Sequence, residues 1–140
     1  MNNVDMARSY LRQSEERLKH AKEALEGGNY AYVLRQSQEA VELSLKAALR
    51  LVGVEPPKWH DVGPLLKRCG DRFPEWFRPL IPSLAAISRK LRREREASLY
   101  GDEETGAPPE ELYTADDARE ALEGALRAHE ACERLLGGFR

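Results

Sequence analysis

The chain has 140 residues, 41% of them hydrophobic and 33% charged, and its 22 basic and 24 acidic side chains give a formal net charge of −2. This length suits a single domain, residues 1–140, with one ordinary hydrophobic core. The near balance of charge excludes a general nucleic-acid coat, which would need a surplus of Lys and Arg, but it leaves room for a small basic site.

Cysteine usage and hydropathy indicate the compartment. Cys69 and Cys132 lie far apart and lack the spacing of metal ligands, so we expect neither a disulfide framework nor a metal site. No apolar run approaches the roughly 20 residues of a membrane-spanning helix, and the first residues lack the apolar stretch of a signal peptide. We therefore expect a cytoplasmic protein without membrane contact.

Two long helices are expected first, from Val4 to Glu26 and from Tyr30 to Val52. Apolar residues recur at spacings of three and four along both segments, which is typical of amphipathic helices. Gly27 and Gly28 end the first helix, and the short connection predicts an antiparallel hairpin. The second helix is apolar on two faces, which predicts a central position.

The positions of the prolines indicate where the next two helices begin. A short third helix is expected from His60 or Asp61 to Cys69. The fourth is expected to begin near Leu80 to Ser83 and to end at about Tyr100, because proline is tolerated only in a first helical turn. The prolines that punctuate the preceding stretch are Pro74, Pro79 and Pro82.

An acidic, proline-bearing loop from Gly101 to Tyr113 is expected to be exposed and mobile. Thr114 then has the features of an N-cap, with Asp116 and Asp117 in the first turn of a fifth helix that ends at Gly137–Gly138. No strand signal competes with these segments. The sequence predicts an all-α fold, an antiparallel up-and-down bundle of four long helices plus one short helix.

Polar residues on the second helix form the first candidate site. Gln38, Glu42 and Lys46 are separated by fours and so share one helix face. The simplest interpretation is an exposed Glu–Lys pair worth a few tenths of a kcal/mol.

The segment Trp59-His60-Asp61 opens the third helix. His60 could act as a catalytic base, because the reference pKa of histidine lies near neutrality. Alternatively, His60 or Asp61 caps the helix while Trp59 packs beneath it.

The densest charge cluster runs from Arg89 to Glu96, and most of it is expected to be a solvated face. Arg95 differs, because it continues an apolar stripe and is followed by Ser98 and Tyr100. Its guanidinium could hold a phosphate or a carboxylate in a crevice of the bundle. The alternative is a buried ion pair with Glu39 or Glu42.

His129 lies on the apolar side of the fifth helix. A single histidine in such a position is usually a hydrogen-bonded core residue. It becomes a catalytic candidate only if the fold brings it beside Arg95.

These segments together resemble the HEPN family (higher eukaryotes and prokaryotes nucleotide-binding domains) over nearly the whole chain. The first helix, from Ala7 to Leu25, is followed by Gly28-Asn29-Tyr30 and by a helix with the sequence SQEAVELSLKAAL. His60-Asp61-Val62, the segment from Arg93 to Gly101, the acidic loop and the Asp-Ala-rich last helix follow in the family's order.

The resemblance implies dimerisation and two kinds of role. Many HEPN proteins are metal-independent ribonucleases, often toxins, with an R-x(4–6)-H motif and sometimes a tyrosine two residues later. Others are partners of minimal nucleotidyltransferases, or dimeric nucleotide-binding domains. Here Arg93 and Tyr100 have the family's spacing, but Ser98 occupies the histidine position. A serine cannot replace imidazole as an acid or base at neutral pH.

Our interpretation is a non-catalytic HEPN protein of toxin–antitoxin type, a homodimer that binds a nucleotide or a nucleotidyltransferase partner. No cofactor or metal is expected besides the nucleotide, no DNA is expected, and RNA is left open. One alternative is a ribonuclease toxin with a divergent site, and another is a structural dimerisation adaptor. The candidate ligand-binding residues are Arg93, Arg95, Ser98, Tyr100, His60, Glu42 and Lys46.

Overall fold

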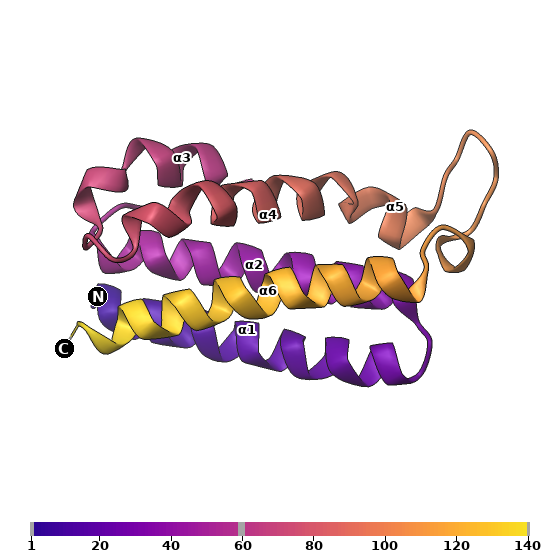
Figure 1. Ribbon diagram of the computed structural model, residues 1–140, viewed down its shortest axis with the longest axis horizontal. Helices are drawn as coiled ribbons and strands as arrows, with labels where there is room; N and C mark the ends of the chain where they lie inside the picture. The colour runs from indigo at the N-terminus through magenta and orange to yellow at the C-terminus, as the bar shows by residue number, and fades with distance from the viewer. Residues whose placement is uncertain (1, 59–60, 140) are drawn as a thin grey trace.

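A computed structural model describes residues 2–58 and 61–139, and this part of the chain forms helices and no β-strand. The long helices alternate in direction (Figure 1), which confirms the predicted antiparallel bundle. Short 3-10 turns lie at 70–72, 78–80 and 109–111. The α-helices are α1 (Asn3–Glu26), α2 (Tyr30–Leu51), α3 (Gly63–Arg68), α4 (Ile81–Arg93), α5 (Arg95–Tyr100) and α6 (Ala115–Gly137).

Helix α2 is the centre of the bundle, as its two apolar faces predicted. It packs against α1 and α6 on one side and against α3, α4 and α5 on the other. Leu45 and Leu49 are fully buried, and burial of a leucine side chain stabilises a fold by about 1.5–3 kcal/mol. The sharp turn that returns α2 along α1 uses Gly28 at φ 78°, a conformation that glycine adopts without steric cost.

The predicted fourth helix is interrupted. The structure ends α4 at Arg93 and starts α5 at Arg95, with Glu94 between them. Neither proline nor glycine marks this position. Two tertiary contacts flank the interruption. The Glu94 carboxylate accepts a hydrogen bond from Tyr113, and Arg95 donates one to Gln38 on α2.

Helix α3 lies directly on α4. A Cβ added at Gly63 would meet the backbone of Ala85 at 3.2 Å, so glycine allows this close approach. The helix is shorter than predicted, spanning Gly63–Arg68 instead of continuing to Cys69. Beyond it, the stacked rings of Phe73 and Phe77, with centroids 4.7 Å apart, fill the core beneath the start of α4.

The acidic loop protrudes from one end of the bundle (Figure 1). It contains a turn closed by a hydrogen bond from the Asp102 N–H to the Ala107 carbonyl. Its expected mobility stays a prediction. Thr114 and Asp117 then form a reciprocal capping box at the start of α6, which confirms the predicted N-cap. Within the described ranges, no helix is long and apolar enough to cross a membrane.

Candidate functional site

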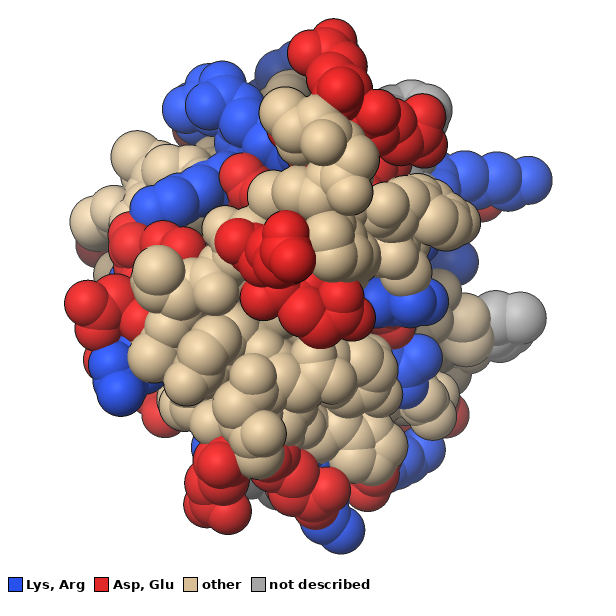
Figure 2. Space-filling view, turned by 90° about the vertical axis from the view of Figure 1, so that its right-hand side faces the viewer, with Lys and Arg blue, Asp and Glu red and all other residues tan. Residues whose placement is uncertain are grey.

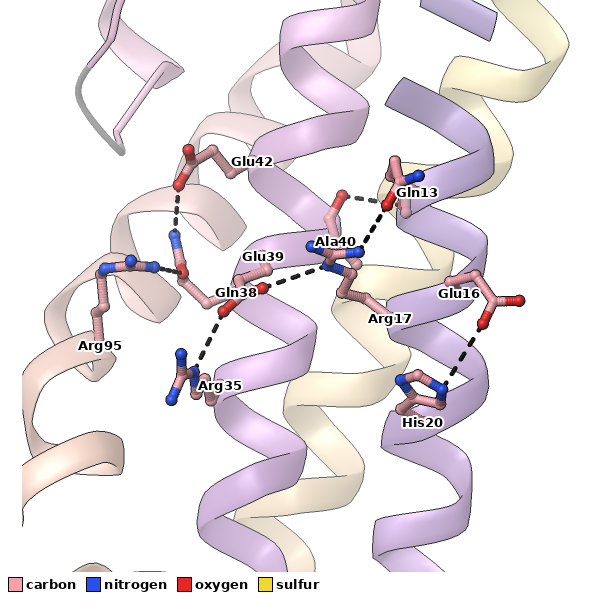
Figure 3. A network of polar contacts seen from close by, with 11 residues as sticks. Gln13, Glu16, Arg17, His20, Arg35, Gln38, Glu39, Ala40, Glu42 and Arg95 are labelled. Carbon is pink, nitrogen blue, oxygen red and sulfur yellow. Dashed lines mark hydrogen bonds and ion pairs between the residues drawn. The ribbon is translucent and has the colours of Figure 1, made fainter. Parts of the chain in front are cut away.

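A chain of hydrogen bonds joins α5 to α2 and collects three of the candidate residues. Arg95 Nη1 donates to Gln38 Oε1 at 2.6 Å, and Gln38 Nε2 donates to Glu42 Oε1 at 3.0 Å. The second carboxylate oxygen of Glu42 accepts from Lys46 Nζ at 3.0 Å. Figure 3 shows Arg95 reaching from α5 to Gln38, with Glu42 next along α2. We call these four residues the α2–α5 polar network.

Two sequence-based interpretations of this region need correction. Arg95 contacts the neutral amide of Gln38, whereas the alternative to ligand binding predicted an ion pair with Glu39 or Glu42. Glu39 instead accepts from Arg17 and Arg35 (Figure 3). The Glu42–Lys46 pair forms as the spacing predicted, but its side chains are only 17% and 15% exposed, so it is not an exposed pair.

Gln38 is the residue that connects this network. The sequence grouped it with Glu42 and Lys46, but it was not among the final candidate ligand-binding residues. It is buried, with 3% of its surface exposed. A buried amide needs hydrogen-bond partners for both its oxygen and its nitrogen. The i, i+4 spacing to Glu42 supplied one of these partners, but nothing in the sequence identified Arg95 as the other.

The remaining arginine and tyrosine candidates lie elsewhere. Arg93 and Tyr100 line a groove between α5 and the acidic loop, and Tyr100 is 69% exposed. Ser98 is buried, and its hydroxyl donates to the Arg95 carbonyl within α5. The same groove contains five carboxylates, which oppose the binding of a phosphate there. They are Glu94, Glu96, Asp102, Glu103 and Glu104.

Tyr113 links two sides of this groove. The Tyr113 hydroxyl donates to Glu94 at 2.7 Å and so ties the end of the loop to the break between α4 and α5. Burial, the hydrogen bond to Glu94 and the negative charge of that carboxylate raise the pKa of Tyr113 above its ordinary value. The phenol is therefore a stable donor at neutral pH.

At the start of α3 the N-cap residue is Val62, which makes no side-chain cap hydrogen bond, and Asp61 lies one residue before it. The Asp61 Oδ1 accepts from the Gly63 N–H at 3.1 Å and from the Ser88 hydroxyl at 3.1 Å, which links α3 to α4. Trp59 and His60 lie outside the described residues, so their predicted roles stay predictions.

His129 has the core role that its position suggested. Its Nδ1 lies 3.0 Å from the Ser14 hydroxyl, whereas Arg95 contacts Gln38 on a different side of α2. Ser14 in turn donates to the Ala40 carbonyl and contacts Ser44. Ser14 is fully buried, whereas the His129 side chain is 12% exposed and lines a groove between α1 and α6.

The charges in the α2–α5 polar network do not balance. In the described part of the chain, no three His, Cys, Asp or Glu side chains form a group that could hold a metal ion. The α2–α5 polar network instead sets two cations, Arg95 and Lys46, around the single carboxylate of Glu42. Its surplus positive charge is the feature that a phosphate or carboxylate group could neutralise.

Comparisons with known proteins agree with this architecture. Residues 7–135 match the HEPN domain family. A protein of Methanocaldococcus jannaschii named "Putative toxin MJ1304" is 28% identical over 96% of this chain and 90% of its own length.

Solved structures give the same result. The crystal structure of TT1696 from Thermus thermophilus superposes with a TM-score of 0.76 at 26% identity, over 96% of this chain and 98% of that one. ST0689, described as an archaeal HEPN homologue, superposes with a TM-score of 0.72 at 25% identity, over 93% and 97% of the two chains.

Proposed function

This chain belongs to the HEPN family, and we propose that it is a non-catalytic, homodimeric member that binds nucleotide phosphates in a toxin–antitoxin system. The observation that carries the proposal is the hydrogen bond from Arg95 to the uncharged amide of Gln38. Among the described residues, no carboxylate lies within ion-pair distance of Arg95. The hydrogen bond to Gln38 therefore positions the Arg95 guanidinium without neutralising its positive charge.

Lys46 supplies the second cation of the proposed site. It shares the Glu42 carboxylate with Gln38, so the network has two positive charges and one negative. Arginine can hold phosphate through two parallel hydrogen bonds, and lysine adds a point charge. A nucleotide phosphate against this face of α2 would balance the charge.

The absence of catalysis is proposed from the position of Ser98. It occupies the histidine position of the ribonuclease motif, and its hydroxyl is already committed to the Arg95 carbonyl. Of the described histidines, His20 lies beside Glu16 and His129 beside Ser14. These contacts support a binding role over proton transfer to RNA.

Dimerisation, a nucleotidyltransferase partner and the toxin–antitoxin setting are proposed from the family resemblance, and the name of the Methanocaldococcus jannaschii relative, "Putative toxin MJ1304", supports a toxin role. Native mass spectrometry of protein purified gently from its own host tests these parts. We expect a dimer that carries a second protein chain or a nucleotide-sized mass. A bare monomer would contradict the partner and dimer proposals.

Calorimetric titration of ATP tests the nucleotide site. We expect wild-type protein to bind, and Arg95→Ala and Lys46→Ala each to weaken binding at least about tenfold, which corresponds to about 1.4 kcal/mol. Arg119→Ala is the matched control, because Arg119 pairs with Asp116 on the exposed face of α6. An absence of heat from the wild type at millimolar ATP would show that the nucleotide proposal is wrong.

A ribonuclease toxin is the second candidate, favoured by the relative's printed name. Labelled RNA incubated with the protein would then be cleaved, and the cleavage would disappear in both Arg93→Ala and Arg95→Ala. A purely structural adaptor is the remaining alternative. In that case Arg95→Ala would lower the stability of the fold without changing any ligand affinity.

A further inference from the structure

Charge is distributed very unevenly along this nearly neutral chain. Residues 53–93, which include α3 and α4, have nine basic and four acidic side chains, whereas residues 94–140 have five basic and thirteen acidic ones. The acidic region contains the loop of residues 101–113. The net charge of −2 therefore results from two regions of opposite charge in one molecule.

The acidic loop, residues 101–113, is tied down at its two ends and exposed between them. A hydrogen bond from the Asp102 N–H to the Ala107 carbonyl closes its turn, and the Tyr113 hydroxyl joins its end to Glu94. Figure 2 shows the end of the bundle that carries this loop, with acidic side chains gathered near the top and the centre. Four exposed carboxylates of the loop make no ion pair with any described residue: Glu103, Glu104, Glu110 and Glu111.

A groove between α3 and α4 has the opposite charge. Lys67 on α3 and Arg89 on α4 line it, and both side chains are exposed. Neither makes an ion pair within the described part of the chain. The one carboxylate that lines the groove is Asp61, which already accepts hydrogen bonds from the Gly63 N–H and the Ser88 hydroxyl. We call this the α3–α4 basic groove, and its charge is positive overall.

The acidic loop and the α3–α4 basic groove cannot meet within one molecule. Helices α4 and α5 separate Ala85, in the groove, from Gly101, where the loop begins, by roughly 24 Å at 1.5 Å per residue. Figure 1 shows α3 toward one end of the bundle and the loop at the other. The bond between Tyr113 and Glu94 keeps the loop at its own end. A contact between the two surfaces therefore needs a second copy of the chain.

We propose that the acidic loop of one copy binds the α3–α4 basic groove of a second copy. The loop has several carboxylates and no basic side chain, and the groove has two exposed cations, so the two surfaces are complementary in charge. Pro64 and Ala85 add a small apolar area to the groove. Because loop and groove are different surfaces, this contact is heterologous. It is separate from the homodimer of the proposed function and does not depend on it.

The test is sedimentation of the purified full-length protein over a concentration series at low and at high salt. We expect wild type to form larger assemblies at low salt than at high salt, because salt screens exposed charges and exposed ion pairs are individually weak. A groove variant, Lys67→Glu/Arg89→Glu, and a loop variant, Glu103→Lys/Glu104→Lys, should each weaken this salt-sensitive association at least tenfold. Circular dichroism checks that both variants are folded.

A mixture of the two variants tests the pairing of the two surfaces directly. The loop variant keeps a native groove, and the groove variant keeps a native loop. The mixture should therefore recover the salt-sensitive association that neither variant shows alone. A mixture that fails to recover it would overturn the proposal.

Arg12→Glu/Lys19→Glu is the matched control for the groove variant, with the same change in net charge. Both residues are exposed on α1, in a groove that they share with several glutamates, and this control should associate as wild type does. Equal losses in the control and the groove variant would overturn the proposal. So would a wild type that forms only a salt-resistant dimer kept by both variants, although the homodimer of the proposed function would then stand. Binding of polyglutamate without self-association would overturn it in favour of a different acidic partner.

Discussion

The hydroxyl of Ser14 lies 3.0 Å from Nδ1 of His129 and so joins the first helix to the last in the interior of the bundle. The same hydroxyl donates to the Ala40 carbonyl on α2. A hydroxyl has one proton to give, so while the Ser14 hydroxyl donates to Ala40 its oxygen can only accept from a neighbouring donor. One buried oxygen thus connects three helices.

We predict that Ser14→Ala destabilises the fold by about 1–3 kcal/mol, because it leaves buried polar groups without a partner. Urea denaturation would measure the loss. Ser37→Ala is a matched control on α2, since the Ser37 hydroxyl is fully buried and has no hydrogen-bond partner among the described residues. Its removal should leave stability unchanged or raise it slightly. Equal losses in the two variants would contradict this account of the Ser14 contacts.

A second prediction concerns Tyr113, whose pKa is raised by burial and by Glu94. The raised pKa means that the folded state favours the neutral phenol. Its stabilising effect is therefore fully present below the unfolded value of about 10 and is lost as the pH rises toward the folded value. Tyr113→Phe should be less stable than wild type at neutral pH, and this difference should shrink above about pH 10.

Denaturation of both proteins across an alkaline pH series would measure that difference. Tyr100→Phe serves as the control, because Tyr100 is exposed and its loss should change stability little at any pH. If the stability difference between wild type and Tyr113→Phe stayed constant or grew with pH, the stabilising effect of Tyr113 would not depend on its neutral phenol.

The helical bundle could be predicted because the sequence features that specify it act over short distances along the chain. Apolar spacing identified the long helices, and Gly28 and Thr114 marked a turn and a cap that the structure confirms. The break at Glu94 had no such signal, since it depends on Tyr113, a residue far along the chain. Predictions from spacing succeed where short-range contacts decide the structure and fail where tertiary contacts do.

The candidate site could be predicted only in part for the same reason. Glu42 and Lys46 pair as their spacing required. Arg93 and Arg95 were grouped by closeness in sequence, yet residues two apart on a helix are turned by about 200° and so point to nearly opposite sides. The structure accordingly places Arg95 against α2 and Arg93 beside the acidic loop. The choice of Gln38 over two nearby carboxylates depends on how α5 sits on α2.

A third prediction tests the loop. Gly101 has φ 80°, and a Cβ there would clash with the Ala107 carbonyl oxygen. Gly106 has a similar φ of 76° but nothing within 4 Å of its Cβ position. Both alanine variants should lose about 1–2 kcal/mol for the left-handed conformation, and Gly101→Ala should lose more because of the clash. Faster proteolysis within residues 101–113 of Gly101→Ala, compared with Gly106→Ala, would be the readout, and equal rates would contradict the prediction.

The two cysteines allow a test of packing around α6. Cys132 is fully buried, and burial raises the pKa of its thiol far above the ordinary value. Because the thiolate is the reactive form, native Cys132 should resist a thiol-specific reagent, while half-buried Cys69 should react first. Quantifying modified thiols by mass spectrometry, with Cys69→Ser to isolate Cys132, would measure the rate of labelling. That rate should fall as conditions favour the folded state, because labelling requires opening of the bundle. Rapid labelling of Cys132 under native conditions would mean that α6 separates from the core more readily than its packing implies.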